Sequence, residues 1–260
     1  MNGVAVCRKL VGVMVAALLW SGVLFAASAA PGAAAAAGCA GNAYVTNEQD
    51  GTVSVITTAT GAVSATLAVA GPARIAITPD GKHAYVTDYL DGQGDTVSVI
   101  TTATGAVSAT ITVAKMGTPG VAITPDGEHA YVTNIVDGTV SVITTATGAV
   151  SAPITVGKGP FTVAITPDGK HAYVTNQFDN TVSVITTAIG AVSAPITVGK
   201  QPDGVAITPD AKHAYVANGG DGTVSVITTA TGAVSAPITT GKGAAAVAIC
   251  PARNAHRRRS

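Results

Sequence analysis

Aromatic and charged side chains are scarce in this sequence of 260 residues: they account for 4% and 11% of it, and the single tryptophan, Trp20, lies within the first thirty residues. A quinone cofactor needs aromatic platforms and a ring of polar contacts, which the rest of the chain does not provide. The motifs of nucleophile elbows (G-x-S-x-G) and phosphate loops (G-x-x-x-x-G-K-S/T) are also missing. We therefore expect no cofactor and no enzymatic activity.

Positive charge is concentrated at the two ends of the chain. Residues 252–260 include the run Arg257 to Arg259, and we expect this basic tail to be disordered, either solvated or touching an anionic surface. Between Cys39 and Cys250, eight lysines and arginines stand against fourteen aspartates and glutamates, which leaves the body with about six net negative charges. A protein that binds a nucleic-acid backbone needs a positive face. Nucleic acid is therefore not an expected partner.

Residues 1–30 have the pattern of a secretory signal peptide. Two basic residues precede an apolar run from Leu10 to Phe25, and small residues with an Ala-x-Ala type cleavage site follow, with cleavage after Ala29 or Ala30. The run is shorter than the roughly twenty residues that cross a bilayer, and an uncleaved anchor is the alternative. Residues 31–38 form an Ala/Gly-rich linker, and no later segment is long enough to cross a membrane. We expect a secreted, periplasmic or cell-surface protein without an integral membrane domain.

The rest of the chain is one module repeated. Equivalent tyrosines recur at spacings of 41, 46, 42 and 42 residues: Tyr44, Tyr85, Tyr131, Tyr173 and Tyr215. This period is typical of four-stranded propeller blades. The copy around Tyr131 predicts strands at Val121–Thr124, His129–Asn134, Thr139–Thr144 and Val150–Val156. Turn residues separate them, so each copy predicts an antiparallel four-stranded meander.

Both faces of the repeated VSVI strand carry small or β-branched residues, so each sheet needs cover on both sides. Radial stacking of like sheets supplies that cover. An open solenoid would need polar end caps, and none is present. The first copy begins at a second strand (Ala43–Asn47) and the last ends on a first strand (Val247–Cys250). The sequence therefore predicts an all-β, five-bladed β-propeller over residues 39–251, closed by pairing of the N- and C-terminal strands.

Two cysteines fall at the expected seam. Cys250 replaces a threonine of the other copies (Thr78, Thr124, Thr166 and Thr208), and Cys39 replaces an aspartate (Asp80, Asp126, Asp168 and Asp210). These positions are two apart across the Pro-Asp-Gly hairpin, within reach of a disulfide in a closed ring. An exported protein favours the oxidised state. We expect a disulfide between Cys39 and Cys250, with lipidation of Cys39 in the segment AAGC as the rival.

The segments AYVTN, VSVIT, GAVSA and VAITPDGKHAYV resemble the YVTN family of β-propeller repeat proteins, over Ala43 to Cys250. The resemblance implies an exported, often cell-surface or periplasmic protein with a propeller domain. It implies little about activity, because similar propellers include lactone hydrolases and quinone-dependent dehydrogenases. Family members often have seven blades, so this five-copy chain resembles a shortened relative.

Catalytic and metal-binding patterns are weak. The five-bladed glycosidase type of site needs acids that point into the central channel, but the expected first strands (IAIT, VAIT and VAIC) contain no acid, histidine or amide. Four histidines recur once per copy, so symmetry spreads them around the ring instead of gathering them on one metal: His83, His129, His171 and His213. Asp137-Gly138 and its equivalents lack the closely spaced ligands of a calcium loop. We expect no metal site.

Differences between the copies concentrate after the second and fourth strands, in connections that emerge on one face of a propeller. They include Glu48, Arg74, Gln177 and Asp203. After the predicted signal peptide, all three aromatics outside the repeated tyrosines also lie there, and with neighbouring aliphatic residues they predict an apolar binding arc: Tyr89, Leu90, Ile135, Val136, Phe161 and Phe178. The alternatives are that these side chains pack on one another or reflect drift.

We therefore expect an exported, monomeric, non-enzymatic propeller that acts as a binding or scaffold module for a protein or glycan at the cell envelope. A lactonase-like propeller hydrolase and a purely structural envelope repeat protein are the alternatives. Acids or histidines that converge at one channel mouth would favour the hydrolase. A shallow apolar patch would favour the binding module.

Overall fold

Strands account for all the regular secondary structure in the described chain. The structure, a computed structural model, describes residues 41–88, 94–113 and 117–250. The predicted signal peptide (1–30), linker (31–38) and tail (252–260) lie outside these ranges, as do Cys39, Tyr89 and Leu90. Within the described ranges no helix is long and apolar enough to span a membrane.

The strands form five antiparallel sheets, and nearly every strand pairs with its neighbours in the chain. The first two sheets contain β1 (Asn42–Asn47), β2 (Thr52–Thr57) and β3 (Ala62–Ala68), then β4 (Pro72–Ile77), β5 (His83–Asp88), β6 (Thr96–Thr101) and β7 (Ala106–Thr112). The third contains β8 (Val121–Ile123), β9 (His129–Asn134), β10 (Thr139–Thr144) and β11 (Ile154–Thr155). The last two contain β12 (Pro160–Ile165), β13 (His171–Asn176), β14 (Thr181–Thr186), β15 (Ala191–Val192) and β16 (Ile196–Thr197), then β17 (Pro202–Ile207), β18 (His213–Asn218), β19 (Thr223–Thr228) and β20 (Ile238–Thr239).

The outermost strand is long in two sheets and short in three. β3 and β7 each run for seven residues, whereas β11, β16 and β20 have two residues each and follow a Ser-Ala-Pro segment. Pro153, Pro195 and Pro237 have no backbone N–H for a ladder hydrogen bond, so pairing is interrupted there. Short, proline-interrupted outer strands also limit edge-to-edge association.

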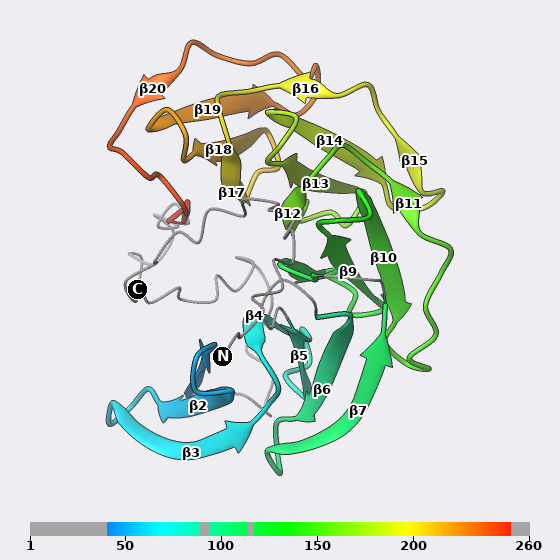
Figure 1. Cartoon of the computed structure of the whole chain (residues 1–260), viewed down its shortest axis with the longest axis vertical. Helices are drawn as coiled ribbons and strands as arrows, with labels where there is room; N and C mark the ends of the chain where they lie inside the picture. Colours follow the sequence, from blue (N-terminus) through cyan, green and yellow to red (C-terminus); the bar gives the residue numbers. More distant parts are fainter. Residues whose placement is uncertain (1–40, 89–93, 114–116, 251–260) are drawn as a thin grey trace, which may run out of the picture.

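The sheets stand around a common centre in chain order (Figure 1). β4, β12 and β17 lie nearest the centre, and β3, β7, β16 and β20 lie on the outside. Neighbouring sheets cover each other's faces, as the fully buried isoleucines of the third strands show: Ile100, Ile143, Ile185 and Ile227. The prediction of an all-β fold made of repeated antiparallel sheets is confirmed, and the arrangement is consistent with a β-propeller-like fold.

The hairpin between first and second strands is held by the same side chains in four sheets. Thr78 Oγ1 donates a hydrogen bond of 2.7 Å to Asp80 Oδ1, which also accepts from the backbone N–H of Lys82 at 3.0 Å. These two donors stabilise the carboxylate, so the pKa of Asp80 is lowered to about 2. The equivalent threonine–aspartate pairs lie 2.5 to 2.6 Å apart: Thr124 and Asp126, Thr166 and Asp168, Thr208 and Asp210. The hairpins predicted from the sequence, Pro-Asp-Gly in three sheets and Pro-Asp-Ala in the fifth, are therefore tight turns that threonine–aspartate hydrogen bonds also stabilise.

The two ends of the row of sheets do not meet. β1 pairs only with β2 among the described strands, and residues 241–250 contain no strand. In Figure 1 the first and last sheets stand on either side of an opening in the ring. The predicted pairing of the N- and C-terminal strands is not found in this structure. The first sheet has three strands because Val247–Cys250, its predicted first strand, does not pair with β1.

Candidate functional site

The connections after the second and the fourth strands lie side by side. The N–H of Val69 donates to the carbonyl of Gly51 at 2.9 Å, and the N–H of Val156 donates to the carbonyl of Gly138 at 2.9 Å. The first bond joins the end of β3 to the β1–β2 turn, and the second joins the end of β11 to the β9–β10 turn. In the repeated module these are the end of the fourth strand and the turn between the second and third strands. Both kinds of connection therefore form one face, which we call the loop face: residues 48–51, 69–74, 135–138, 157–162, 177–180, 199–204, 219–222 and 241–243.

The predicted apolar arc is split between exposed and buried side chains. Val136 and Phe178 are 58% and 64% exposed, whereas Ile135 is only 8% exposed. Phe178 packs over Gly159, where an added Cβ would lie 2.6 Å from the phenyl ring. Tyr89 and Leu90 lie outside the described residues. The described part of the arc therefore offers Val136 and Phe178 to solvent and places Ile135 in the core.

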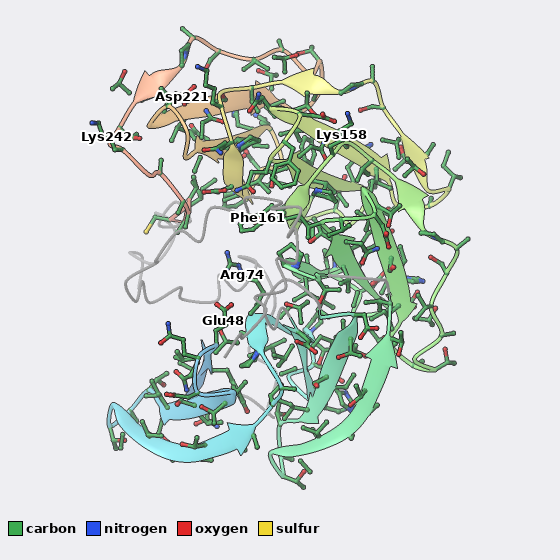
Figure 2. All side chains as sticks on the ribbon, viewed as in Figure 1. Glu48, Arg74, Lys158, Phe161, Asp221 and Lys242 are labelled. Atoms are coloured by element: carbon green, nitrogen blue, oxygen red, sulfur yellow. The ribbon has the colours of Figure 1, made fainter. Side chains whose placement is uncertain are left out.

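Phe161, the remaining described residue of the predicted arc, lies at the centre of the ring of sheets. The guanidinium carbon of Arg74 lies 5.7 Å from the centre of the Phe161 ring, which is a cation–π distance. Figure 2 shows both side chains in the central region, with Glu48 beside Arg74. Arg74 comes from β4 and Phe161 from β12, two strands of non-adjacent sheets. The contact therefore joins side chains across the centre of the ring.

A backbone irregularity positions these central side chains. In β4, β12 and β17 the ladder register shifts just after the first residue, which is proline in each strand. Such an irregularity bends a strand and re-aims its side chains. Arg74, Phe161 and Asp203 all lie within the shifted segments. One local geometry, repeated in three sheets, thus places three copy-specific side chains at the loop-face end of the centre.

Asp203 is the buried carboxylate of this group, at 6% exposure. Its Oδ1 accepts a short hydrogen bond from Nε2 of Gln177. Burial raises the pKa of Asp203, and the hydrogen bond from Gln177 and the charge of Arg74 oppose that rise. Burial likewise lowers the pKa of Arg74, with Asp203 and Glu48 opposing. The two groups therefore stabilise each other's charged form in a partly dry environment.

We call Glu48, Arg74, Phe161, Gln177 and Asp203 the central cluster. Its two carboxylates and one guanidinium give a formal net charge of −1, which disfavours a strongly anionic ligand. Its carboxylates accept hydrogen bonds, the guanidinium donates them, and the carboxamide does both. An aromatic ring stands beside them. This combination suits a neutral polar ligand or a polar protein side chain.

The copy-to-copy comparison found each member of the central cluster but could not show that they converge. The sequence favours the aromatic residues for binding, because aromatic side chains are common interface anchors. Which copy-specific residues share one environment depends on the stacking of sheets one, two, four and five, and no local sequence pattern reports that stacking. The sequence feature that points to the central cluster is that Arg74 and Asp203 depart from the repeat.

Histidines and acids elsewhere do not assemble into a metal site. Among residues 41–88, 94–113 and 117–250, no group of three or more histidine, cysteine, aspartate or glutamate side chains could hold a metal ion. Each repeated histidine begins a second strand, and its carbonyl accepts a backbone hydrogen bond, as His83 does from Thr78 at 2.9 Å. The histidines therefore occupy equivalent positions in separate sheets.

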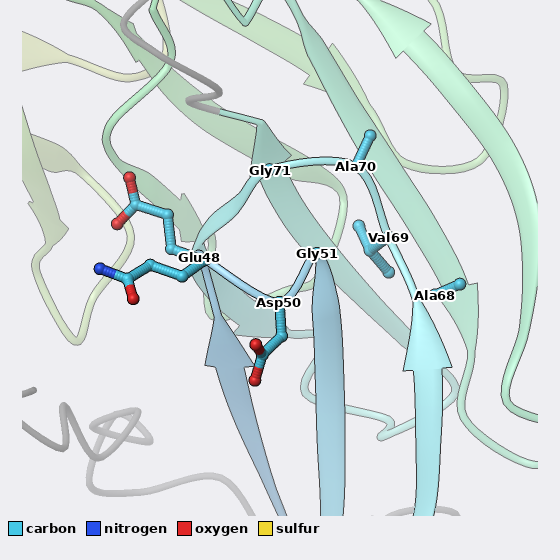
Figure 3. Close-up of a pocket in the computed structure, with 8 residues that line it drawn as sticks. Glu48, Asp50, Gly51, Ala68, Val69, Ala70 and Gly71 are labelled. Atoms are coloured by element: carbon cyan, nitrogen blue, oxygen red, sulfur yellow. The ribbon is translucent and has the colours of Figure 1, made fainter.

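A shallow depression of about 480 Å³ lies at the loop-face end of the first sheet. Residues of the β1–β2 turn and of the β3–β4 connection line it: Glu48, Gln49, Asp50, Gly51, Ala68, Val69, Ala70 and Gly71. Figure 3 shows the carboxylates of Glu48 and Asp50 projecting from the turn. The depression is acidic and belongs to one end of the row of sheets.

The fold and the loop face define an all-β, propeller-like protein with a polar central cluster. No family model and no curated protein matches the chain. Among solved structures, hydrazine synthase from Kuenenia stuttgartiensis is similar, with 26% identity, a TM-score of 0.67 and coverage of 77% of this chain and 63% of that chain. A functionally unknown protein from Desulfotomaculum acetoxidans DSM 771 is also similar, with 22% identity, a TM-score of 0.66 and coverage of 77% and 67%.

These likenesses bear on the fold. The chain spans less than two thirds of the length of the hydrazine synthase chain that it matches. The similarity to the second protein, at 22% identity, concerns the fold alone. Both agree with a β-propeller-like arrangement of repeated sheets.

Proposed function

We propose that this protein is an exported, non-enzymatic binding or scaffold module that presents its loop face to a protein or glycan partner at the cell envelope. One observation carries the proposal. Arg74, Phe161 and Phe178 depart from the repeat and lie on the loop face, as do Gln177 and Asp203, whereas the repeated valines and isoleucines of the strands pack the sheets together. Arg74, Phe161 and Asp203 meet near the centre, and Phe178 is exposed on the same face. A purely structural repeat protein would have no need of side chains that differ between copies on one face only.

Phe178 is the best-placed anchor for a partner. Its side chain is 64% exposed and lies over Gly159, so partner contact would bury a large rigid ring at low cost in conformational entropy. Central-cluster side chains would supply directional hydrogen bonds beside it. The negative body also favours a neutral or cationic partner surface over an anionic one.

The proposal includes location and architecture. The apolar N-terminal run supports export, and the repeated AYVTN and VSVIT segments support membership of the YVTN propeller repeat proteins. We place the protein in the secreted, periplasmic or cell-surface compartment as a monomer. We also propose that its five sheets are the blades of one propeller and that the N- and C-terminal strands pair to close it.

Capture from envelope extract tests the binding role. The exported chain is immobilised, and bound proteins and glycans are quantified against the double variant Phe161→Ser/Phe178→Ser. We expect at least a thirtyfold loss of affinity for the specific partner, which corresponds to about 2 kcal/mol, a typical hot-spot effect. Ile189→Ser is the matched control, because Ile189 is 76% exposed and copy-specific but lies in a turn between third and fourth strands, away from the loop face.

Equal recovery by the double variant and the wild type, at unchanged thermal stability, would remove the binding role of these residues and favour a structural envelope repeat protein. Loss of recovery by the Ile189→Ser control as well would indicate nonspecific apolar adsorption.

A second candidate function is a propeller hydrolase, and one observation favours it. Asp203 and Glu48 converge with Arg74 at one mouth of the centre, and burial raises the pKa of Asp203. A carboxyl with a raised pKa beside a guanidinium can transfer a proton while the cation stabilises developing negative charge. A panel of lactone, ester and glycoside substrates tests this role. Turnover by the wild type that Asp203→Asn abolishes and Ile189→Ser retains would establish the hydrolase.

A further inference from the structure

The outer edges of the five sheets differ at one backbone position. Thr66 of β3 and Thr110 of β7 stand where the other three sheets have Pro153, Pro195 and Pro237. β3 and β7 each run for seven residues and contain no charged side chain and no glycine. Figure 1 shows both strands on the outside of the ring, and among the described strands each pairs only with its inner neighbour, β2 or β6. The outer edge of each strand is therefore open within the described part of the chain.

The ladder of the second sheet shows which way the position of Thr110 faces. The N–H of Val113, directly after β7, donates to the carbonyl of Asp95 at 2.9 Å, so it points toward β6. Backbone groups of an antiparallel strand face its two sides in alternation. The N–H and carbonyl groups of Thr110 and Thr112 therefore point away from β6, and both residues are exposed.

The three prolines stand at the same outward-facing position. The N–H of Val156 donates to the carbonyl of Gly138 at 2.9 Å, so the same alternation turns the backbone of Pro153 outward. Val198 and Thr240 make the equivalent bonds at 3.0 and 2.9 Å. Proline has no N–H, so it removes the donor that an added strand would use. Proline on an edge is a common protection against strand addition, and β3 and β7 lack that protection.

A groove of about 320 Å³ lies beside the open edge of β7. Ser108, Ala109 and Ile111 of β7 form one wall, and Thr147 and Gly148 of the β10–β11 connection in the third sheet form the other. Ser108, Ala109 and Thr147 are exposed. The mouth of the groove therefore opens on the outer rim, next to the outward-facing backbone of β7.

The floor of the groove is buried. Tyr85 of β5 and Val99 of β6 are 2% and 6% exposed, and His83 and Thr145 complete the lining. The hydroxyl of Tyr85 donates a long hydrogen bond of 3.4 Å to the carbonyl of Thr145, and burial raises the pKa of Tyr85. No lysine, arginine, aspartate or glutamate lines the groove. A large apolar side chain suits this floor, whereas a charged one would be buried without a permanent opposite charge beside it.

We propose that the outer edge of β7 is a docking site for an extended, uncharged segment of a partner protein, which adds to the second sheet as a further strand. The outward backbone groups of Thr110 and Thr112 pair with the backbone of this segment, and one large apolar side chain, such as phenylalanine or leucine, enters the groove. In strand addition, backbone hydrogen bonds supply affinity and side-chain pockets supply specificity. The site lies on the outer rim, separate from the loop face, so it does not depend on a loop-face partner.

The chemistry of the edge argues for this occupant. On its inner side β7 already accepts a neutral strand of small and β-branched residues, β6, with the sequence TVSVIT. The outer side offers the same kind of backbone and no lysine, arginine, aspartate or glutamate, so a charged segment would gain no ion pair there. A second copy fits less well. Its open edge strands, β3 and β7, expose no side chain larger than valine, which would leave the groove largely empty.

Labelled peptides test the site on the full exported chain. The first is the acetylated peptide TVSFIT, which is the β6 sequence with phenylalanine at its fourth position, and two others carry alanine or aspartate at that position. Fluorescence anisotropy measures the affinity of each. We expect the alanine peptide to bind about tenfold more weakly than the phenylalanine peptide, and the aspartate peptide more weakly still, because only a large apolar side chain fills the groove.

Two variants of β7 separate the backbone from the groove. Thr110→Pro should weaken binding of the phenylalanine peptide about tenfold, because one ladder donor is lost and the proline ring obstructs pairing beside it. Three sheets of this chain carry proline at this position, so we expect the variant to fold. Ala109→Phe fills the groove from β7, so it should remove the preference for phenylalanine over alanine, and it carries the test if Thr110→Pro does not fold. Thr66→Pro, the same change on β3, is the matched control and should bind the peptide like the wild type.

Equal binding of the three peptides by the wild type, or unchanged binding by Thr110→Pro at unchanged thermal stability, would overturn the proposal. Equal loss of binding by Thr66→Pro would also overturn it, since the peptide would then not be selecting β7. Self-association of the wild type without peptide, seen by sedimentation and abolished by Thr110→Pro, would assign the edge to a second copy instead of a partner segment. The double variant Phe161→Ser/Phe178→Ser should bind the peptide like the wild type, so failure of the loop-face proposal and failure of this one are distinguishable.

Discussion

Removing the hydroxyl of Thr175 should loosen the contact between the fourth and fifth sheets. The side chain is fully buried, and its Oγ1 donates to the carbonyl of Asp203 at 2.9 Å while accepting from the N–H of Thr162 at 3.0 Å. Thr175→Ala removes both bonds and leaves a buried carbonyl and a partly buried N–H without this partner. Each net hydrogen bond contributes about 1 kcal/mol, and an unsatisfied buried group costs about 1–3 kcal/mol. We expect a loss of about 2–3 kcal/mol in the free energy of unfolding.

Thr175→Ser separates the hydrogen bonds from the methyl group. Serine keeps the hydroxyl and loses about one buried methyl, worth about 1 kcal/mol, so it should remain more stable than Thr175→Ala by about 1 kcal/mol or more. Urea unfolding at constant m value measures both variants, with Thr110→Ala on an exposed outer strand as the control. Two results would refute the conclusion that the Thr175 hydroxyl stabilises the contact between these sheets. One is equal stability of the serine and alanine variants, and the other is an alanine variant within about 0.5 kcal/mol of the wild type.

Further tests address the core, the threonine–aspartate pairs of the hairpins, the buried carboxylate of Asp203 and the two ends of the row of sheets. Ile143→Ala, at a fully buried site, should lower the free energy of unfolding by about 2–5 kcal/mol in urea titration. Asp80 has its pKa lowered to about 2 in the folded state. Its contribution to the free energy of unfolding is therefore present above the unfolded pKa and lost as pH falls from about 4 to 2. Asp80→Asn should weaken this loss of stability at acid pH, and an unchanged pH dependence would contradict the stabilising role of the Thr78–Asp80 hydrogen bond. Asp203 has a raised pKa, so its sign is opposite: stability falls as pH rises from the unfolded pKa through the folded one, and Asp203→Asn should flatten this slope in thermal melts. Ile196 packs on Gly232 of the next sheet, whereas Ile238, its equivalent in the last sheet, is 48% exposed. In a ring closed by pairing of the terminal strands, Ile238→Asp should lower Tm about as much as Ile196→Asp, whereas an open row of sheets predicts a much smaller effect for Ile238→Asp.

Local structure was predictable wherever one repeat contains all the interacting residues. The Pro-Asp-Gly hairpins, the alternation of the TVSVIT strands and the antiparallel meander each depend on residues close in sequence, and the structure confirms them. The short outer strands follow from Pro153, Pro195 and Pro237, and the sequence contained that signal although the prediction for residues 150–156 was one longer strand. The three prolines interrupt a ladder that the alternation alone would have continued.

The candidate site was predictable only in part. Comparison of the copies identified Arg74, Phe161, Gln177 and Asp203 as departures, because a repeat makes its exceptions visible. It could not tell that Ile135 is buried while Val136 beside it is exposed, since burial within a turn depends on tertiary packing. Nor could it tell that Phe161 lies beside a guanidinium from a sheet two places away.

The sequence by itself determined the period, the strand order, the turns and the positions where the repeat is broken, because these depend on backbone preferences and on side chains within about forty residues of each other. Only the tertiary structure decided which exceptions meet, that the inner ends of three sheets bring Arg74, Phe161 and Asp203 to one place, and that the two ends of the row stand apart. Those outcomes depend on the angle at which one sheet packs on the next. Each interface is made of small side chains such as valine, alanine and threonine, so the angle is set by the summed packing of whole sheets and by no single residue that a sequence pattern could reveal.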